Sequence, residues 1–344
     1  MEADLAQEAI RKVLCGKHKR QDLADRLYGW VAGPGRTATV NKILAKKKLS
    51  ADVYELLVEA PLIARARKAG QFVIVQIDTD WGERIPLTIA DADSAAGTVT
   101  LVFQAVGATT HKLAEKEVGD HVENILGPLG NPTHVKKYGT VVCVGGGIGV
   151  APLHPIAEAL KAAGNKVIII IGARNKDLVI FEDRMRKIAD ELVIVTDDGS
   201  YGRKALVTEP LKEYCSATPK PDFAIAIGPP IMMKFCAEAT RPFGVPTEVS
   251  LNTIMIDGTG MCGGCRVTVG GEVKFVCVDG PEFDGHKVDF DNMMIRLRAY
   301  KAHEDEAHHE CHLGLGLEPH APATAAPATA APAAAAAGAK GATK

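Results

Sequence analysis

The sequence is poor in aromatic residues and has neither a long apolar run nor an excess of charge of one sign. Aromatic side chains make up 5% of its 344 residues, and the formal net charge is −2. A near-balanced charge, with a pI of about 6.6, argues against general nucleic-acid binding, which usually needs a basic face. No apolar run approaches the ~20 residues that a membrane-spanning helix requires. We therefore expect neither a nucleic-acid partner nor a membrane partner.

The first residues, MEADLAQEAIRKVL, also lack the apolar segment of a secretion signal, which predicts a cytoplasmic protein. Glycine is plentiful, at 34 residues, and apolar residues reach 47%, which is typical of an α/β enzyme. Three of the eight cysteines lie between positions 262 and 277. In a reducing compartment such clustering favours metal or cluster binding over disulfides.

The spacing of apolar residues divides the chain into five parts. Residues 1–37 have helical spacing and form a helical extension of unassigned function. Residues 38–137 contain short strand-like runs between turn residues, which predicts an antiparallel barrel. In residues 138–245 apolar strands alternate with helices, which predicts a parallel sheet covered on both faces. Residues 246–300 are a Gly- and Cys-rich unit followed by a helix. Residues 301–344 are a tail, rich in Ala and Pro and disordered from about 320.

A glycine run joins the first strand of the α/β part to its first helix. Gly145, Gly146, Gly147 and Gly149 follow the apolar TVVCV and precede VAPLHPIAEAL. Glycines let the backbone approach a pyrophosphate, and a helix N-terminus supplies amide donors and a partial positive charge. The spacing is not G-x-G-x-x-G, and Pro152 falls in the first helical turn, which points away from an ordinary Rossmann dehydrogenase. A tight strand–helix turn is the alternative, but the placement favours dinucleotide binding.

Three later strands end in residues suited to the same ligand. Arg174 follows KVIIIIGA, Asp197 follows ELVIVT, and Gly228, Pro229 and Met232 follow DFAIAI. Ligands of parallel sheets bind at the carboxyl ends of the strands. Each end alone is compatible with simple turn chemistry, whereas three along one edge favour a site.

Two segments of the predicted barrel offer groups for a diphosphate and a flat ring. Arg84 can hold a diphosphate through charge-assisted hydrogen bonds, and the Pro-Leu-Thr that follows Ile85 offers an extended backbone. The run Gly-Ala-Thr-Thr before HKLAEK can add amides and a hydroxyl. Each segment alone is as compatible with an ordinary turn.

The spacing Asp257-x4-Cys262-x2-Cys265-x11-Cys277 is the most specific feature of the sequence. The C-x2-C pair puts two thiolates within reach of one iron, and Cys277, on the predicted strand VKFVCV, supplies a third. The surrounding glycines leave backbone N–H groups free to bond sulfides. A structural zinc site is the alternative, because the same donors suit tetrahedral zinc. Asp257 is followed by glycine, so a plain turn is also possible there.

Taken in order, R-x-P-L-T, G-x-x-T before a helix, GGGIGVAP and GPP-x-M resemble the ferredoxin-reductase superfamily. In that superfamily the barrel binds FAD and the next domain binds NAD(P)H, here NADH by resemblance. The implied FAD contacts are Arg84, Pro86, Leu87, Thr88, Gly107 and Thr110. The implied NADH contacts are Gly145, Gly146, Gly147, Gly149, Pro152, Gly228 and Met232, beside the strand-end residues Arg174, Asp197 and Pro229. Thr109 stands where many members have glycine.

The cysteine-rich unit resembles the [2Fe–2S] domain of the dihydroorotate dehydrogenase electron-transfer subunit, whose first cysteine lies five residues before the C-x2-C pair. Asp257 occupies that place here. A carboxylate ligand marks a sister group, the small subunit of the NADH-dependent reduced ferredoxin:NADP+ oxidoreductase. The resemblance runs from about Val40 to Tyr300 and assigns Asp257, Cys262, Cys265 and Cys277 to the cluster.

The same resemblance implies hydride exchange between NADH and FAD and a one-electron relay through the cluster. It further implies a larger flavoprotein partner with FAD and [4Fe–4S] clusters, with ferredoxin acting through the complex by electron bifurcation. Two alternatives stay open. One is the electron-transfer subunit of a dihydroorotate dehydrogenase, and the other is a non-catalytic zinc-binding docking module.

Overall fold

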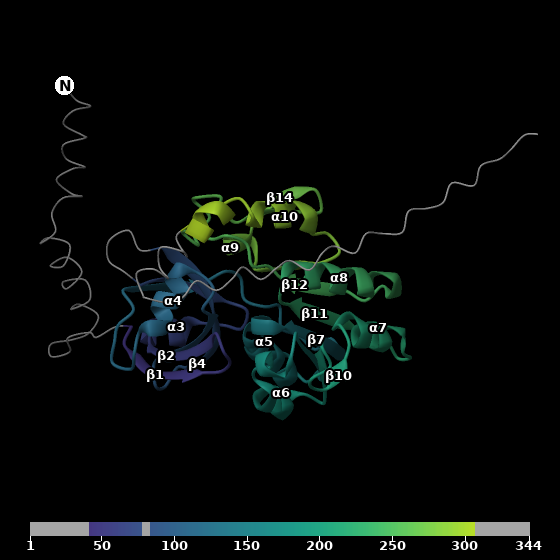
Figure 1. The fold of residues 1–344 in the computed structure, drawn as a ribbon. Helices are drawn as coiled ribbons and strands as arrows, with labels where there is room; N and C mark the ends of the chain where they lie inside the picture. The colour runs from purple at the N-terminus through teal and green to yellow at the C-terminus, as the bar shows by residue number, and fades with distance from the viewer. Residues whose placement is uncertain (1–40, 78–82, 307–344) are drawn as a thin grey trace, which may run out of the picture.

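The structure is a computed structural model that describes residues 41–77 and 83–306 (Figure 1). The predicted extension at 1–37 and the Ala/Pro-rich tail lie outside these residues. An antiparallel unit and a parallel-sheet unit stand side by side, and a smaller cysteine-bearing unit lies across them (Figure 1). In the described part of the chain, no helix has both the length and the apolar character needed to span a bilayer.

The first unit is a six-stranded antiparallel sheet in the order β1-β2-β5-β4-β3-β6. Its strands are β1 (Ile43–Lys48), β2 (Val53–Glu59), β3 (Phe72–Gln76), β4 (Arg84–Asp93), β5 (Thr98–Gln104) and β6 (Asn124–Leu129). An antiparallel bridge between Lys42 and His121 brings the segment before β6 back to the first strand, so the sheet curls on itself. This unit also contains two helices, α3 (Pro61–Ala66) and α4 (Ala108–Glu115).

The second unit is a seven-stranded sheet in the order β10-β9-β8-β7-β11-β12-β15, parallel except for β15. Its strands are β7 (Thr140–Gly146), β8 (Lys166–Ala173), β9 (Glu191–Thr196), β10 (Arg203–Lys204), β11 (Phe223–Ile227), β12 (Thr247–Ser250) and β15 (Glu282–Asp284). Its helices are α5 (Val150–Ala162), α6 (Glu182–Ile188), α7 (Thr208–Ser216) and α8 (Pro230–Thr240).

Both faces of this sheet are buried, which explains its unbroken apolar strands. Along β7, Val141 and Cys143 pack with α5 and α6, whereas Val142 and Val144 pack with α7 and α8. The antiparallel sheet followed by a helix-covered parallel sheet confirms the predicted fold class.

The third unit consists of a long loop after β12, the hairpin β13 (Arg266–Val269) and β14 (Glu272–Phe275), and the helices α9 (Val276–Asp279) and α10 (Phe290–Leu297). Between these helices the chain returns to the parallel sheet as β15, paired with β12. The third unit is therefore joined to the sheet by hydrogen bonds as well as by the chain.

Several local predictions were wrong. Cys277 lies in α9 rather than on a strand, because Asp279 accepts a hydrogen bond from the Phe275 N–H and turns the chain after β14. Within the alternating part, the α-helix after β8 begins only at Glu182, since Phe181 before it has a φ of +60°. The last predicted helix is interrupted after Leu297, and α3, which starts at Pro61, was not predicted.

Candidate functional site

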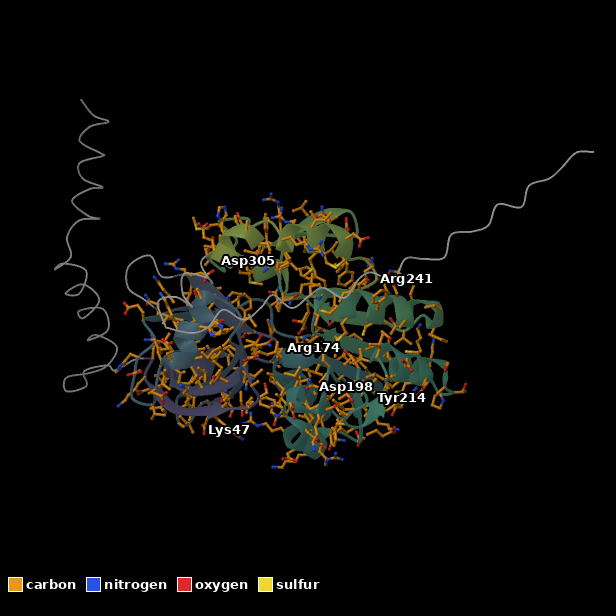
Figure 2. All side chains as sticks on the ribbon, in the orientation of Figure 1. Lys47, Arg174, Asp198, Tyr214, Arg241 and Asp305 are labelled. Carbon is orange, nitrogen blue, oxygen red and sulfur yellow. The ribbon has the colours of Figure 1, made fainter. Side chains whose placement is uncertain are left out.

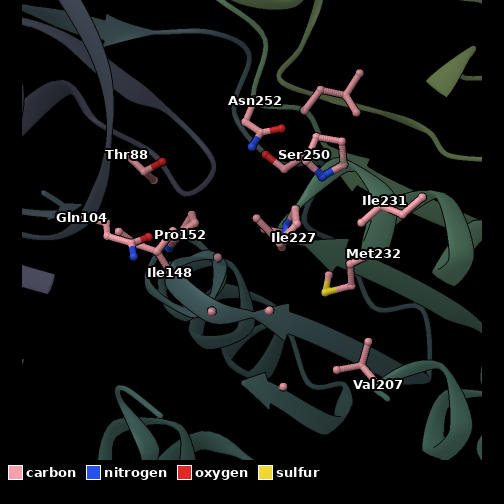
Figure 3. Close-up of a pocket in the computed structure, with 18 of the residues that line it drawn as sticks. Thr88, Gln104, Ile148, Pro152, Val207, Ile227, Ile231, Met232, Ser250 and Asn252 are labelled. Atoms are coloured by element: carbon pink, nitrogen blue, oxygen red, sulfur yellow. The ribbon is translucent and has the colours of Figure 1, made fainter. Parts of the chain in front are cut away.

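A cavity of about 1180 Å³ lies between the antiparallel unit and the carboxyl ends of the parallel strands. Thr88 and Gln104 reach it from the first unit, Pro152 and Met232 from helices of the second, and Asn252 from the loop after β12 (Figure 3). Its size and its position at a sheet's carboxyl edge suit a large nucleotide ligand.

The glycine run forms the floor of this cavity. β7 passes through a single 3₁₀ turn, Gly147–Gly149, into α5, whose first turn has no side-chain cap. The Val150 N–H donates to the carbonyls of Gly147 and Ile148, and Pro152 has no N–H, so what this end of α5 offers an anion in the cavity is mainly its partial positive charge. A Cβ on Gly149 would collide with the carbonyl oxygen of Ile227, and one on Gly146 with the sulfur of Met232. Gly147, at a φ of +54°, lines the cavity and has open space around it.

The predicted strand-end residues meet at the same cavity. Arg174, Asp197, Gly228, Pro229 and Met232 all line it, as do Gly146, Gly147, Gly149 and Pro152. Figure 2 shows Arg174 near the centre of the molecule, where the two large units meet. Loss of water around Asp197 and the charge of Asp198 raise the pKa of Asp197, while Arg174 opposes that shift. Gly145 lies behind the wall, packed against Val150.

The predicted barrel contacts divide into two groups. Pro86, Leu87, Thr88 and Thr110 line the cavity, whereas Arg84 and Gly107 are not in its wall. The Thr110 hydroxyl accepts hydrogen bonds from the N–H groups of Val106, at 3.0 Å, and Gly107, at 2.9 Å. Thr110 thus stabilises the turn at the start of α4, which is the ordinary turn that the sequence also allowed for this segment. The Thr109 hydroxyl donates to the Glu83 carboxylate, which ties α4 to the residue before Arg84.

Several lining residues escaped the sequence analysis. They are Gln104 on β5, Ser250 at the end of β12, and Asn252, Thr253 and Met255 in the loop that follows. Ser250 ends a parallel strand, so the same strand-end rule that singled out Gly228 could have found it. The loop residues carry no motif of their own.

The loop between β12 and β13 (residues 251–265, the cysteine loop) brings Cys265 next to Cys277 of α9. The sulfur atoms of Cys265 and Cys277 lie 3.2 Å apart, and both side chains are buried. The N–H of Cys277 faces the Cys265 sulfur at 3.5 Å, and the N–H of Gly264 faces the Cys262 sulfur at 3.4 Å. Burial, followed by the contact with Cys265, raises the pKa of the Cys277 thiol to about 12. Sulfur atoms flanked by backbone N–H groups are the environment that iron–sulfur clusters use.

Asp257 organises the exposed part of this loop. One carboxylate oxygen accepts the Thr259 N–H at 2.8 Å, and the other accepts the Cys262 N–H at 2.7 Å. The hydrogen bond from Thr259 and that from Cys262 lower the pKa of Asp257, which keeps an anion beside the Cys262 backbone. Asp257 therefore has a turn-forming role whether or not it also binds a metal.

The chemistry of the donor set fits an iron–sulfur cluster. Three thiols and a carboxylate sit on one loop and the adjoining α9. Across residues 41–77 and 83–306, however, no three His, Cys, Asp or Glu side chains are already grouped closely enough to hold a metal ion. Cys262 is exposed, whereas Cys265 and Cys277 are buried.

Comparisons with known proteins assign two segments to domain families. Residues 143–238 match the oxidoreductase NAD-binding domain, which includes the glycine run and all three strand ends. Residues 252–289 match the iron–sulfur cluster binding domain of dihydroorotate dehydrogenase B, which includes Asp257 and the three clustered cysteines.

Whole-chain relatives agree with these matches. The chain is 48% identical to a Thermotoga maritima protein called a homolog of the dihydroorotate dehydrogenase B (NAD(+)) electron transfer subunit, over 78% of this chain and 94% of that one. It is 35% identical to the Desulforamulus reducens electron transfer subunit itself, over 72% and 96%.

Among solved structures, one described for flavin-based electron bifurcation in the NADH-dependent reduced ferredoxin-NADP oxidoreductase is 46% identical. It aligns over 81% of this chain and 99% of the other, with a TM-score of 0.76. An Amycolatopsis cytochrome P450 reductase, 23% identical with a TM-score of 0.50 over 60% and 66% of the two chains, shares the fold.

Proposed function

We propose that this chain, which belongs to the family of the dihydroorotate dehydrogenase B electron transfer subunit, is the NADH-binding subunit of an electron-bifurcating oxidoreductase. It would connect NADH to a larger flavoprotein that also handles NADPH and ferredoxin. The observation that carries the proposal is the spacing of Asp257, five residues before the C-x2-C pair, where by resemblance the family has its first cluster cysteine. The 46% identity to the bifurcating oxidoreductase structure, across 99% of that chain, supports the same assignment.

Residues in and beside the cavity would bind two nucleotides. Pro86, Leu87, Thr88 and Thr110 would hold FAD from the first unit, together with Arg84 and Gly107 at its diphosphate. The glycine run and α5 would bind the NADH pyrophosphate, and Arg174 and Asp197 its ribose end. When bound, FAD exchanges a hydride with NADH and electrons singly with a [2Fe–2S] cluster.

The protein's own part in this chemistry is placement and electrostatics. Gly258 packs against Ile74 of β3 and Leu129 of β6. A side chain at Gly258 would collide with both residues, so the cysteine loop lies directly against the flavin-binding unit. Asp257, Cys262, Cys265 and Cys277 would hold the cluster at that contact.

A second candidate is the electron transfer subunit of a dihydroorotate dehydrogenase. The 48% identity to the Thermotoga maritima homolog favours it. The two functions differ in the partner subunit and share the chemistry of this chain.

The deciding experiment is anaerobic purification of the full chain with its partner, followed by a visible spectrum and assays. We expect flavin bands with broad sulfur-to-iron absorption, NADH:acceptor activity by this chain alone, and ferredoxin reduction only with the larger flavoprotein. A partner that oxidises dihydroorotate would establish the second candidate. A colourless chain with stoichiometric zinc would reject both and establish the zinc-binding docking module.

A further inference from the structure

Two carboxylates outside the proposed binding sites lie together at the last two strands of the parallel sheet. Glu282 opens β15 opposite Ser250, and Glu248 of β12 lies opposite Asp284. Directly opposed residues in an antiparallel pair share one face of the sheet, as do residues two apart. Glu248, Ser250, Glu282 and Asp284 therefore project from the same face.

The linker between β6 and β7 (residues 130–139), which joins the two large units, covers this face. Thr133, in that linker, is buried, and its hydroxyl donates to the Glu282 carboxylate at 2.7 Å. Its N–H donates to the carbonyl of Ala69 in the antiparallel unit at 2.9 Å. Glu282 thus lies where all three units and the linker meet.

Glu282 also lies directly behind the cavity wall. Pro281, Ser250 and Gly70 line the cavity. A Cβ on Gly70 would collide with the Thr133 hydroxyl and lie 2.8 Å from a Glu282 carboxylate oxygen, and Gly70 has a φ of +84°. Glycine at this position leaves room for the Thr133–Glu282 hydrogen bond. The same short segment leads back through Gly280, whose N–H donates to the Val276 carbonyl, to Cys277 in α9, so one short segment connects Glu282 with a cluster cysteine.

Within the described residues, no Lys or Arg pairs with the Glu282 carboxylate. In the part of the chain that the structure describes, neither Glu282 nor Glu248 forms an ion pair with a Lys or Arg, whereas Asp284 is paired with Lys287 at 3.1 Å. The other charged or titratable groups facing the pair come from the linker. They are His134, Lys136 and Tyr138.

Together these groups bring the pKa of Glu282 close to neutral pH. Burial, followed by the charge of Glu248, raises the pKa of Glu282 to about 7, although the Thr133 hydrogen bond opposes the shift. Burial raises the pKa of Glu248 as well, with His134 and Lys136 opposing. Burial and the two carboxylates raise the pKa of Tyr138 to about 12, so Tyr138 stays neutral. Additional negative charge nearby would raise the affinity of Glu282 for a proton further.

We propose that Glu282 is a redox-linked proton site: its carboxyl binds a proton when electrons enter the adjacent cavity or cysteine loop and releases it when they leave. The inference rests on the proposed redox function. NADH supplies the electrons, the proton comes from water, and the only bond formed is the O–H of the carboxyl. Glu282 acts through its charge and touches none of the reacting atoms.

The test compares Glu282→Gln with Asp284→Asn, which removes one carboxylate charge from the same strand. In the full chain loaded with flavin and cluster, the midpoint potentials are followed from about pH 6 to about pH 8, together with redox-induced infrared difference spectra in H₂O and D₂O. We expect a carboxylic C=O band that is sensitive to D₂O in the wild type and in D284N and is lost in E282Q. The potentials of E282Q should depend less on pH.

An unchanged C=O band and pH dependence in E282Q would overturn the proposal. If E282Q does not fold, Thr133→Val is the second variant. Loss of its hydrogen bond should move the band's titration to higher pH, and an unmoved titration also overturns the proposal. A chain that binds neither flavin nor iron would instead reject the proposed function, so the two failures are distinguishable.

Discussion

The sulfur atoms of Cys265 and Cys277 lie 3.2 Å apart, although the two residues belong to different elements of the third unit. Cys265 precedes β13, and Cys277 lies in α9 after the hairpin. The hairpin therefore acts as the spacer that brings a second buried thiol to the C-x2-C pair. Any ligand held by both sulfurs also joins the cysteine loop to the segment that carries Glu282.

Replacing Cys277 by Ser should remove the cluster while leaving the flavin. The thiol is buried beside Cys265, and no other cysteine in the described part of the chain is positioned to replace it. We expect iron content and sulfur-to-iron absorption to be lost and flavin bands to persist. Cys143→Ala is the matched control, since Cys143 is buried in β7, and it should keep full iron content. Iron retained in C277S would contradict the ligand assignment.

Asp257 can be tested by two substitutions with opposite expectations. Asp257→Asn keeps an acceptor for the Cys262 or Thr259 N–H but removes the anion, so the cluster should be lost or bound much more weakly. Asp257→Cys supplies a fourth thiolate, so a cluster should form with an altered EPR signal and potential, because thiolate and carboxylate differ as iron ligands. An EPR signal and potential identical to the wild type in D257C would show that Asp257 only shapes the turn.

Gly149→Ala should disturb both packing and nucleotide binding. Its Cβ would collide with the carbonyl of Ile227 and lie 2.8 Å from the Cα of Gly228, so β11 and α5 must separate. We expect a loss of about 1–3 kcal/mol in the free energy of unfolding, together with weaker NADH binding by fluorescence titration. Gly107→Ala is the control for stability, because its Cβ meets nothing within 4 Å. Equal stability of the two variants would contradict the close approach.

Asp197→Asn should shift nucleotide preference towards NADPH. Asp197 lines the cavity close to Arg174, and a carboxylate there repels a 2′-phosphate while it accepts a ribose hydroxyl. Without that charge, Arg174 is free to attract the phosphate. We expect the ratio of kcat/KM for NADPH to that for NADH to rise on the order of tenfold, equivalent to ~1.4 kcal/mol. An unchanged ratio would place the ribose elsewhere.

The sequence predicted best those features that local periodicity controls. The strands around Val142 and Ile169 are continuous apolar runs because both sheet faces are covered, and their type and order were predictable from that pattern. The strand-end residues Arg174, Asp197 and Gly228 share one cavity because parallel strands end at one edge, which is also a general rule.

What the sequence did not reveal depends on individual side-chain contacts, some local and some tertiary. Cys277 lies in a helical turn because the nearby Asp279 side chain accepts the Phe275 N–H, a local contact that strand propensity does not anticipate. Asn252 and Met255 line the cavity only because the third unit folds back over it. Glu282 had no motif at all, since its significance comes from Thr133 and Gly70, which are distant in the chain.

The pH dependence of unfolding provides a last prediction, one that needs no cofactor. An unfolded Glu has a pKa of about 4.3, whereas burial and Glu248 raise the pKa of folded Glu282 to about 7. Between these values the folded state binds more protons, so the contribution of Glu282 to stability falls as pH rises through this range and is constant above it.

Urea unfolding of the wild type and of Glu282→Gln measures this contribution. As pH rises through the window, the free energy of unfolding of the wild type should fall relative to that of E282Q by on the order of 1–3 kcal/mol. Asp284→Asn is the matched control, because it removes a carboxylate of the same strand, one that is paired with Lys287. A flat difference for E282Q would mean that Glu282 titrates normally in the folded chain.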